Sequence, residues 1–191
     1  EIEREEGRTY VHAFDDEAVM AGQGTIGLEI LDQQPDVETV VVPIGGGGLI
    51  AGIATAIKAQ RPDVRIIGVQ AEGAASVPES LEQGEVHTRE SVDTVADGIA
   101  TRSVGERTFE IIEQRVDEVV TVSDEEIALA LTLLLERSKT LVEGAGAVAL
   151  AAVLERRFDY REGEVIVPAL CGGNIDMNVL TTVILRGMVQ M

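Results

Sequence analysis

The spacing of hydrophobic and polar positions along the chain predicts strands that alternate with helices. Strands are predicted for short β-branched or apolar runs, at 39–42, 65–71, 118–122 and 164–170. Helices are predicted where apolar residues recur every three or four positions, at 49–60, 106–115, 124–138, 146–157 and from 176 onward. Two strands joined by a helix of about a dozen residues pair in parallel through a right-handed crossover. The pattern therefore predicts an α/β fold with a largely parallel twisted sheet.

The segments outside this pattern carry weaker signals. Residues 1–7 resemble the end of a charged helix, and Thr9–Val11 is expected to form a short strand. Asp16 should cap a helix that Gly22–Thr25 interrupts and that then continues to residue 33. Residues 85–103 are polar without a clear period, and a loop of this length is more often functional than a simple connection.

The chain is organised around a strand that opens onto a run of glycines. The strand at 39–42 ends at Pro43, the glycines are Gly45, Gly46, Gly47 and Gly48, and an apolar helix starts near Leu49. The first amides of a helix have no internal partner and carry positive potential, so this loop is a candidate anion site. No Lys, Ser or Thr follows as a P-loop requires. Backbone alone would hold the phosphate, which favours an organic cofactor over a magnesium nucleotide; the alternative is a flexible turn.

A second glycine turn, Gly172–Gly173, follows the strand predicted at 164–170. In an open parallel sheet the ligand crevice lies at the carboxyl ends of the strands, so both turns are expected to border one pocket. A competing interpretation is dinucleotide binding, because Gly46, Gly48 and Ala51 match the Gly/Ala form of that motif and Glu72 ends the next strand. Alone, this motif is weak.

Composition narrows the class of protein. The 191 residues fit one domain, and a net charge of −19 with Lys58 and Lys139 as the two lysines argues against nucleic-acid or anionic-membrane partners. Such an acidic, lysine-poor surface suits a halophilic source, although an ordinary acidic cytosolic protein is the alternative. No apolar run is long enough for a membrane span. A lone cysteine, Cys171, excludes an internal disulfide and fits a reducing, cytoplasmic setting.

Taken together, several later segments resemble the pyridoxal 5′-phosphate (PLP) dependent threonine and serine dehydratases, which share the tryptophan-synthase-β fold type. In the family's order, they are GQGTIGLEI, PIGGGGLIAGIA, GVQAEG, VADGIA, RSKTLVEGAGAVALAAVL and ALCGGNIDMNVL. The resemblance spans nearly the whole chain. It implies the large-domain part of a fold-type II PLP enzyme, with helices on both faces of the sheet.

The resemblance also implies roles for single residues. The loop from Gly45 to Leu49 matches the segment whose amides hold the PLP phosphate, and Cys171 matches a position facing the pyridine nitrogen. Gly98 matches a backbone position beside the imine end of the cofactor, and Glu143 an acid near its ring. A monovalent or divalent cation site seen in some members corresponds to Glu72 and Ser76. Pro78 stands where a carboxylate ligand would be, which weakens the expectation of a divalent ion.

The side chain of Cys171 suggests how the cofactor would react. A carboxylate at the pyridine nitrogen would keep it protonated, whereas a neutral thiol cannot, so prompt loss of a β-hydroxyl is favoured over a long-lived carbanion. The alternative is a buried structural cysteine, which is common.

The family's Schiff-base lysine belongs to a Ser-Phe-Lys motif, and a Ser-Gly-Asn-His loop holds the substrate carboxylate. Neither motif occurs in this sequence, and neither Lys58 nor Lys139 matches the family's lysine. We therefore expect residues 1–191 to form a single partial catalytic domain, the C-terminal portion of the catalytic region, without a regulatory domain. Alone, it should be inactive.

The expected function of the parent enzyme is α,β-elimination of L-threonine to 2-oxobutanoate and ammonia, a step of isoleucine biosynthesis. The expected partners are a small amino-acid substrate and further copies of the chain, as a homodimer or homotetramer. Alternatives are a serine dehydratase or racemase of the same family, an NAD-type dinucleotide-binding domain, or a catalytically dead binding module.

Overall fold

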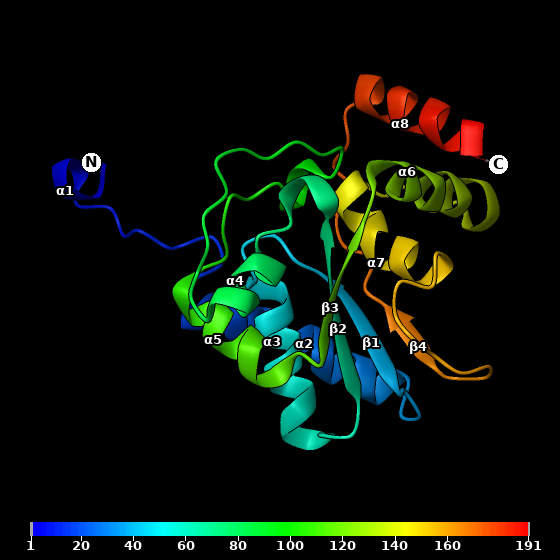
Figure 1. The fold of residues 1–191 in the computed structure, drawn as a ribbon. Coiled ribbons are helices and arrows are strands. Elements are labelled where there is room, and N and C mark those ends of the chain that lie inside the picture. Colours follow the sequence, from blue (N-terminus) through cyan, green and yellow to red (C-terminus); the bar gives the residue numbers. More distant parts are fainter. Residues whose placement is uncertain (1, 191) are drawn as a thin grey trace.

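The computed structural model describes residues 2–190 and has an α/β architecture (Figure 1). Its four strands pair in parallel in the order β3-β2-β1-β4. Their bounds are β1 Thr39–Pro43, β2 Arg65–Ala71, β3 Glu118–Val122 and β4 Ile166–Pro168. The predicted parallel α/β sheet is confirmed.

Helices cover both faces of this sheet, with α2, α3 and α5 on one side and α6, α7 and α8 on the other (Figure 1). The α-helices are α1 Ile2–Glu6, α2 Glu17–Gln33, α3 Gly48–Gln60, α4 Val77–Gln83, α5 Glu106–Arg115, α6 Asp124–Leu133, α7 Gly144–Leu154 and α8 Met177–Gln190. Short 3₁₀ turns lie at Glu72–Ala74 and Asp97–Ile99, and a π-helical turn at Leu134–Ser138 extends α6. Among the described residues, no helix is both long and apolar enough to cross a bilayer.

The two cores follow from the period-2 alternation of side chains along a strand. On β1, Val40 and Val42 pack with the core beneath α3 and α5, whereas Val41 packs with the core beneath α6 and α7. All three valine side chains are fully buried. A β-branched run that is apolar at every position is thus explained by a strand covered on both faces.

The strand order creates a crevice beside β1. The chain passes from β1 through α3 to β2 on one side, but after β3 it returns to place β4 on the other side of β1. Connections that leave two neighbouring strands in opposite directions open a gap at their carboxyl ends. The loops that follow β1 and β4 therefore lie on either side of one crevice.

The strand predicted at Thr9–Val11 is wrong. Residues 9–11 form no strand, and the side chains of Tyr10 and Val11 are 66% and 62% exposed. Figure 1 shows α1 lying apart from the sheet and this segment running from α1 toward the body of the molecule. A β-branched residue favours a strand when it packs on a pleated surface, and this segment has no neighbouring strand.

The predicted interruption at Gly22–Thr25 is also wrong, because α2 runs unbroken from Glu17 to Gln33. Two of its glycines, Gly24 and Gly27, serve helix packing. A Cβ on Gly24 would lie 3.1 Å from the carbonyl oxygen of Gly52 in α3, and one on Gly27 would lie 3.0 Å from that of Ile53. The two helices approach so closely that side chains are excluded at these points.

Element ends differ in smaller ways. The strand predicted at 164–170 is reduced to β4 and is half-buried rather than buried, because it pairs with β1 alone among the described strands. The helix predicted at 146–157 begins at Gly144 and ends at Leu154. The predicted helix ends at Glu1 and Met191 lie outside the described residues.

Candidate cofactor-binding site

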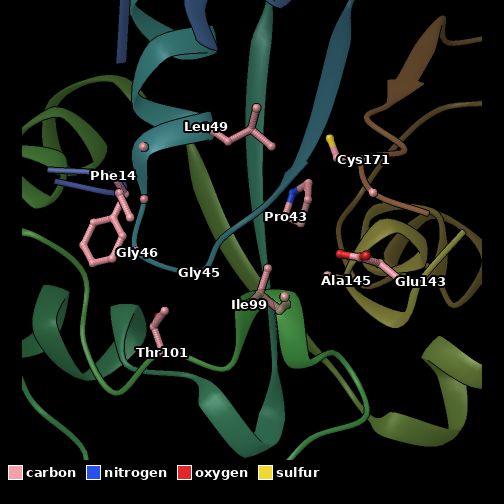
Figure 2. A pocket seen from close by; sticks show the side chains of 15 residues that line it. Phe14, Pro43, Gly45, Gly46, Leu49, Ile99, Thr101, Glu143, Ala145 and Cys171 are labelled. Atoms are coloured by element: carbon pink, nitrogen blue, oxygen red, sulfur yellow. The ribbon is translucent and has the colours of Figure 1, made fainter. Parts of the chain in front are cut away.

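A cavity of about 490 Å³ lies in the crevice between the loops that follow β1 and β4 (Figure 2). All of the residues that the resemblance assigns to cofactor binding line it, namely Gly45, Gly46, Gly47, Gly48, Leu49, Gly98, Glu143 and Cys171. Gly172 lines it as well, so the expectation that both glycine turns border one pocket is confirmed. Ala13, Phe14, Pro43, Ile99, Thr101 and Ala145 complete the lining.

The glycine loop presents buried amides that lack protein partners. Gly46 to Gly48 are buried, and within residues 2–190 no backbone carbonyl accepts a hydrogen bond from the amide of Gly45, Gly46 or Gly47. Gly48 and Leu49 form the first turn of α3, whose amides have no acceptor inside the helix. Buried amides are normally paired, so these donors are suited to an anionic ligand.

The glycines are required because neighbouring groups press against the loop. A Cβ on Gly46 would lie 2.2 Å from the ring of Phe14, and one on Gly48 would lie 2.9 Å from the carbonyl oxygen of Phe14. Gly47 has φ of 95°, which L side chains rarely adopt, and its Cβ would lie 2.7 Å from Oγ1 of Thr108. Any side chain at these three positions would collide with Phe14 or Thr108, so the loop can keep this conformation only as glycine.

The opposite wall of the cavity holds a carboxylate and a thiol, as Figure 2 shows for Glu143 and Cys171. Glu143 precedes α7, and its Oε2 accepts a hydrogen bond of 3.2 Å from the amide of Asn174. A Cβ on Gly98 or Gly172 would lie 2.6 or 2.5 Å from Oε1 of Glu143. These two glycines let the carboxylate sit between the loops.

The thiol of Cys171 is held in its neutral form. Burial raises the pKa of this thiol above its ordinary value, and the negative charge of Glu143 raises the pKa further. A neutral thiol can donate or accept a weak hydrogen bond but does not act as a counter-ion. The side chain at position 171 therefore brings no negative charge to this wall of the cavity.

Replacing Glu143 with glutamine should make Cys171 more reactive. The change removes the charge that raises the pKa of the thiol but keeps an oxygen for the amide of Asn174. At pH 8, where the thiolate is the reactive form, we expect alkylation by iodoacetamide to become about two- to fivefold faster. Cys171 is the one cysteine of the sequence, so the rate reports this position alone. Glu155→Gln, at the other end of α7, is the matched control, and equal rates in both variants would contradict the prediction.

Sequence reasoning missed Phe14, Thr101 and Thr108. Phe14 and Thr101 line the cavity, while Thr108 contacts the glycine loop from behind. Oγ1 of Thr101 is buried and lacks a hydrogen-bond partner among the described residues. In the view of Figure 2, Ile99, at the end of the 3₁₀ turn, and Thr101, just after it, lie below Gly45. No local pattern marks Phe14 or Thr108, and Thr101 lies in the loop 85–103, whose length but not whose single residues indicated a function.

Glu72 and Ser76 lie away from this cavity. Glu72 is exposed after β2, where it adds to the effect of the Glu126 hydrogen bond in raising the pKa of Arg157. Ser76 is buried, and its Oγ has no partner within the described part of the chain. In residues 2–190 no three His, Cys, Asp or Glu side chains gather as a metal site would need. The cation site at Glu72 and Ser76 stays a prediction.

Both lysines also lie outside the cavity lining. Lys58, near the end of α3, forms an ion pair of 2.8 Å with Asp117. Lys139 follows the π-helical turn, and its Nζ donates to the carbonyl oxygen of Glu136. Neither lysine is positioned to react with a ligand held by the glycine loop.

The comparisons with known proteins agree with this site. The family model described as "Pyridoxal-phosphate dependent enzyme" matches residues 1–172. An L-threonine ammonia-lyase of Geobacter sulfurreducens is 54% identical over 189 residues, which are 99% of this chain and 47% of that protein. The chain thus spans about half the length of the curated relatives that it matches.

Solved structures give the same result. The processed form of threonine deaminase isoform 2 from Solanum lycopersicum superposes with a TM-score of 0.92 at 37% identity, covering 98% of this chain and 52% of that one. Maize serine racemase gives a TM-score of 0.89 at 34% identity, covering 99% and 58%. The fold-type II architecture is therefore shown. Because the family model matches most of this chain and a glycine cradle lies where a phosphate would bind, the chain belongs to the pyridoxal-phosphate dependent enzyme family.

Proposed function

We propose that this chain is the cofactor-binding half of an enzyme that converts L-threonine to 2-oxobutanoate and ammonia with PLP. One observation carries the proposal: the cavity has glycine amides at the N-terminus of α3 without a backbone acceptor in residues 2–190 on one side, and the thiol of Cys171, with its raised pKa, on the other. Relatives at 45–54% identity are named threonine ammonia-lyases or threonine dehydratases, which favours threonine as the substrate.

The residues present fit the phosphate of PLP. The amides from Gly45 to Leu49 would bind it, with no basic side chain among the residues that line the cavity. Helix dipole and amide hydrogen bonds together suit a phosphate monoester. When bound, PLP withdraws electrons from the α-carbon of an amino acid, so that a proton can leave that carbon and a hydroxyl can leave the next one.

The other wall would tune this chemistry. With its pKa raised, the thiol of Cys171 stays protonated at neutral pH and cannot balance a positive charge on the pyridine nitrogen. That limits how much negative charge the ring can hold and favours elimination over slow racemisation. Burial and, as the smaller cause, the charge of Glu143 keep the thiol in this state, and Glu143 is itself oriented by the amide of Asn174.

The alternatives have less support. Serine racemases match as structures at 34–35% identity, below the threonine enzymes. Dinucleotide binding would need Glu72 near the glycine loop to contact a ribose, but Glu72 is exposed and is not among the residues that line the cavity.

A calorimetric titration tests the proposal directly. PLP and inorganic phosphate should bind to the wild-type chain, and NAD should not. Glu72→Ala should leave phosphate binding unchanged, because this residue lies outside the cavity. NAD binding that depends on Glu72, with neither phosphate nor PLP bound, would overturn the assignment in favour of a dinucleotide site.

The 191-residue chain mixed with PLP and L-threonine should release no 2-oxobutanoate. Lys58 is paired with Asp117 and Lys139 lies beyond α6, so neither can form a Schiff base with PLP in the cavity. Following 2-oxobutanoate by a coupled lactate-dehydrogenase-type assay checks this, with the complete threonine dehydratase of a relative as the positive control. Steady turnover by the chain alone would contradict the expectation.

The charge balance favours a source with high internal salt. With 34 acidic residues against 15 basic ones, repulsion is unscreened over about 30 Å at 0.01 M salt and over about 3 Å at 1 M. We expect the melting temperature to rise as KCl is added across this range. Sucrose at matched osmolality is the control, and a flat or falling curve in KCl would count against a halophilic source.

A further inference from the structure

Thr108 contacts the glycine loop from the side of α5, outside the cavity lining. It lies in the first turn of α5 and is fully buried. Its Oγ1 donates a hydrogen bond of 2.8 Å to the carbonyl oxygen of Gly46. The amide of Gly105 donates to the same oxygen at 3.2 Å and also reaches Oγ1 of Thr108 at 3.0 Å. The carbonyl of Gly46 is thus held toward α5 by two donors.

This contact determines the direction of the next amide. In a planar trans peptide the N–H of one residue points opposite to the C=O of the residue before it. Because the carbonyl of Gly46 points to α5, the amide of Gly47 points away from α5, on the side where the loop lines the cavity. That amide donates to no backbone carbonyl among the described residues.

We propose that Thr108 is a positioning residue of the phosphate cradle, whose hydroxyl holds the Gly46–Gly47 peptide so that the amide of Gly47 faces the bound phosphate. The inference rests on the proposed function, because it assumes that the glycine loop binds a phosphate. Thr108 itself touches no ligand. It acts through the peptide that it orients.

Two further features support this role. Gly47 lacks the Cβ that would lie 2.7 Å from Oγ1 of Thr108, so the glycine and the threonine fit one another. Asp15 fixes the start of α5, since its Oδ1 accepts from the amides of Arg107 at 3.1 Å and Thr108 at 3.2 Å. A carboxylate at a helix N-terminus is stabilised by the helix dipole. Residues from three segments therefore set one peptide plane.

The test compares variants that keep or remove the hydroxyl. Thr108→Val is nearly isosteric and removes it, whereas Thr108→Ser keeps it. Thr132→Val is the matched control, because Thr132 is also buried and its Oγ1 donates 2.8 Å to the carbonyl oxygen of Ala128, in α6. Inorganic phosphate is titrated into each variant by calorimetry, and each is melted.

We expect Thr108→Val to weaken phosphate binding by at least about tenfold, as the loss of one charge-assisted hydrogen bond would. Thr108→Ser should stay within about twofold of wild type. Thr132→Val should lower the melting temperature without changing phosphate affinity. Wild-type affinity in a folded Thr108→Val variant would overturn the positioning role while leaving the proposed function intact.

A second measurement does not depend on a variant that folds. In the wild-type chain, the amide resonance of Gly47 should move strongly downfield as phosphate is added, since its N–H would become a hydrogen-bond donor to the anion. An unchanged Gly47 resonance at saturating phosphate overturns the inference. If the wild type binds neither phosphate nor PLP, the proposed function fails first, and the positioning role fails with it.

Discussion

Replacing Gly47 with aspartate is expected to abolish phosphate binding by a chain that still folds. Gly47 has φ of 95°, and a Cβ there would lie 2.7 Å from Oγ1 and 2.8 Å from Cβ of Thr108. A non-glycine residue in such a conformation costs roughly 1–3 kcal/mol, and the buried threonine leaves no room to relieve it. The backbone would have to move, and the amides of the loop would move with it.

The measurement is a calorimetric titration of phosphate and PLP, with a thermal melt to confirm folding. We expect at least about a hundredfold loss of affinity, because several amide hydrogen bonds to one anion are lost together. Gly163→Asp is the matched control, because it adds the same charge. Gly163 also has a positive φ, of 80°, but a Cβ there would have no neighbouring atom within 4 Å in the described part of the chain. Gly163→Asp should bind phosphate as the wild type does. Normal binding by a folded Gly47→Asp chain would refute the cradle.

The second large effect is expected on stability, where two Gly→Ala changes in packed helices should have opposite signs. A Cβ on Gly52 in α3 would lie 2.2 Å from the carbonyl oxygen of Met20 and 2.7 Å from the amide nitrogen of Gly24, both in α2. These are backbone atoms, so the two helices would have to separate. Overpacking of this kind costs about 1–3 kcal/mol or more, and we expect Gly52→Ala to be near the upper end.

Gly22 provides the contrasting case. It lies exposed in α2, and a Cβ there would have no atom from outside its own stretch of helix within 4 Å in residues 2–190. Alanine there should raise the free energy of unfolding by roughly 0.5–1 kcal/mol, because it reduces the freedom of the unfolded chain and favours the helix. Urea denaturation of both variants gives the comparison. An unchanged stability in Gly52→Ala would show that the contact between α2 and α3 does not depend on Gly52, and destabilisation by Gly22→Ala would contradict the expectation for an exposed helix position.

These glycines illustrate where sequence reasoning fails. The cluster Gly22–Thr25 has the composition of a helix break, yet α2 passes through it. Intrinsic helix propensity is a weak guide here, because glycine lets the two helices approach closely and this packing outweighs its low propensity. Gly47 is a second such case. From the sequence alone, an aspartate at this position would be expected to place its carboxylate in the anion cradle. In the structure the Cβ would point at Thr108 and Ile112 instead.

The sequence by itself determined the local elements and the glycine loop. Strands β1 and β2 follow from short, largely apolar β-branched runs, as in a strand buried on both faces. The helix between them follows from an apolar period near 3.6 residues. The candidate anion site follows from the order strand, glycines, helix N-terminus, all within residues 39–60. These features depend on neighbouring residues, so a linear pattern contains them.

The tertiary structure decided how distant groups reach that loop, and it alone brought in Phe14 and Thr108. β4 lies beside β1 rather than beside β3, and this brings Cys171 to the crevice. Thr108 reaches the carbonyl of Gly46 across 62 positions of sequence, and Phe14 reaches the loop from before α2. Such contacts depend on how the helix layers pack on the sheet. Unlike the period of a helix or strand, this packing cannot be recognised from neighbouring residues in the sequence.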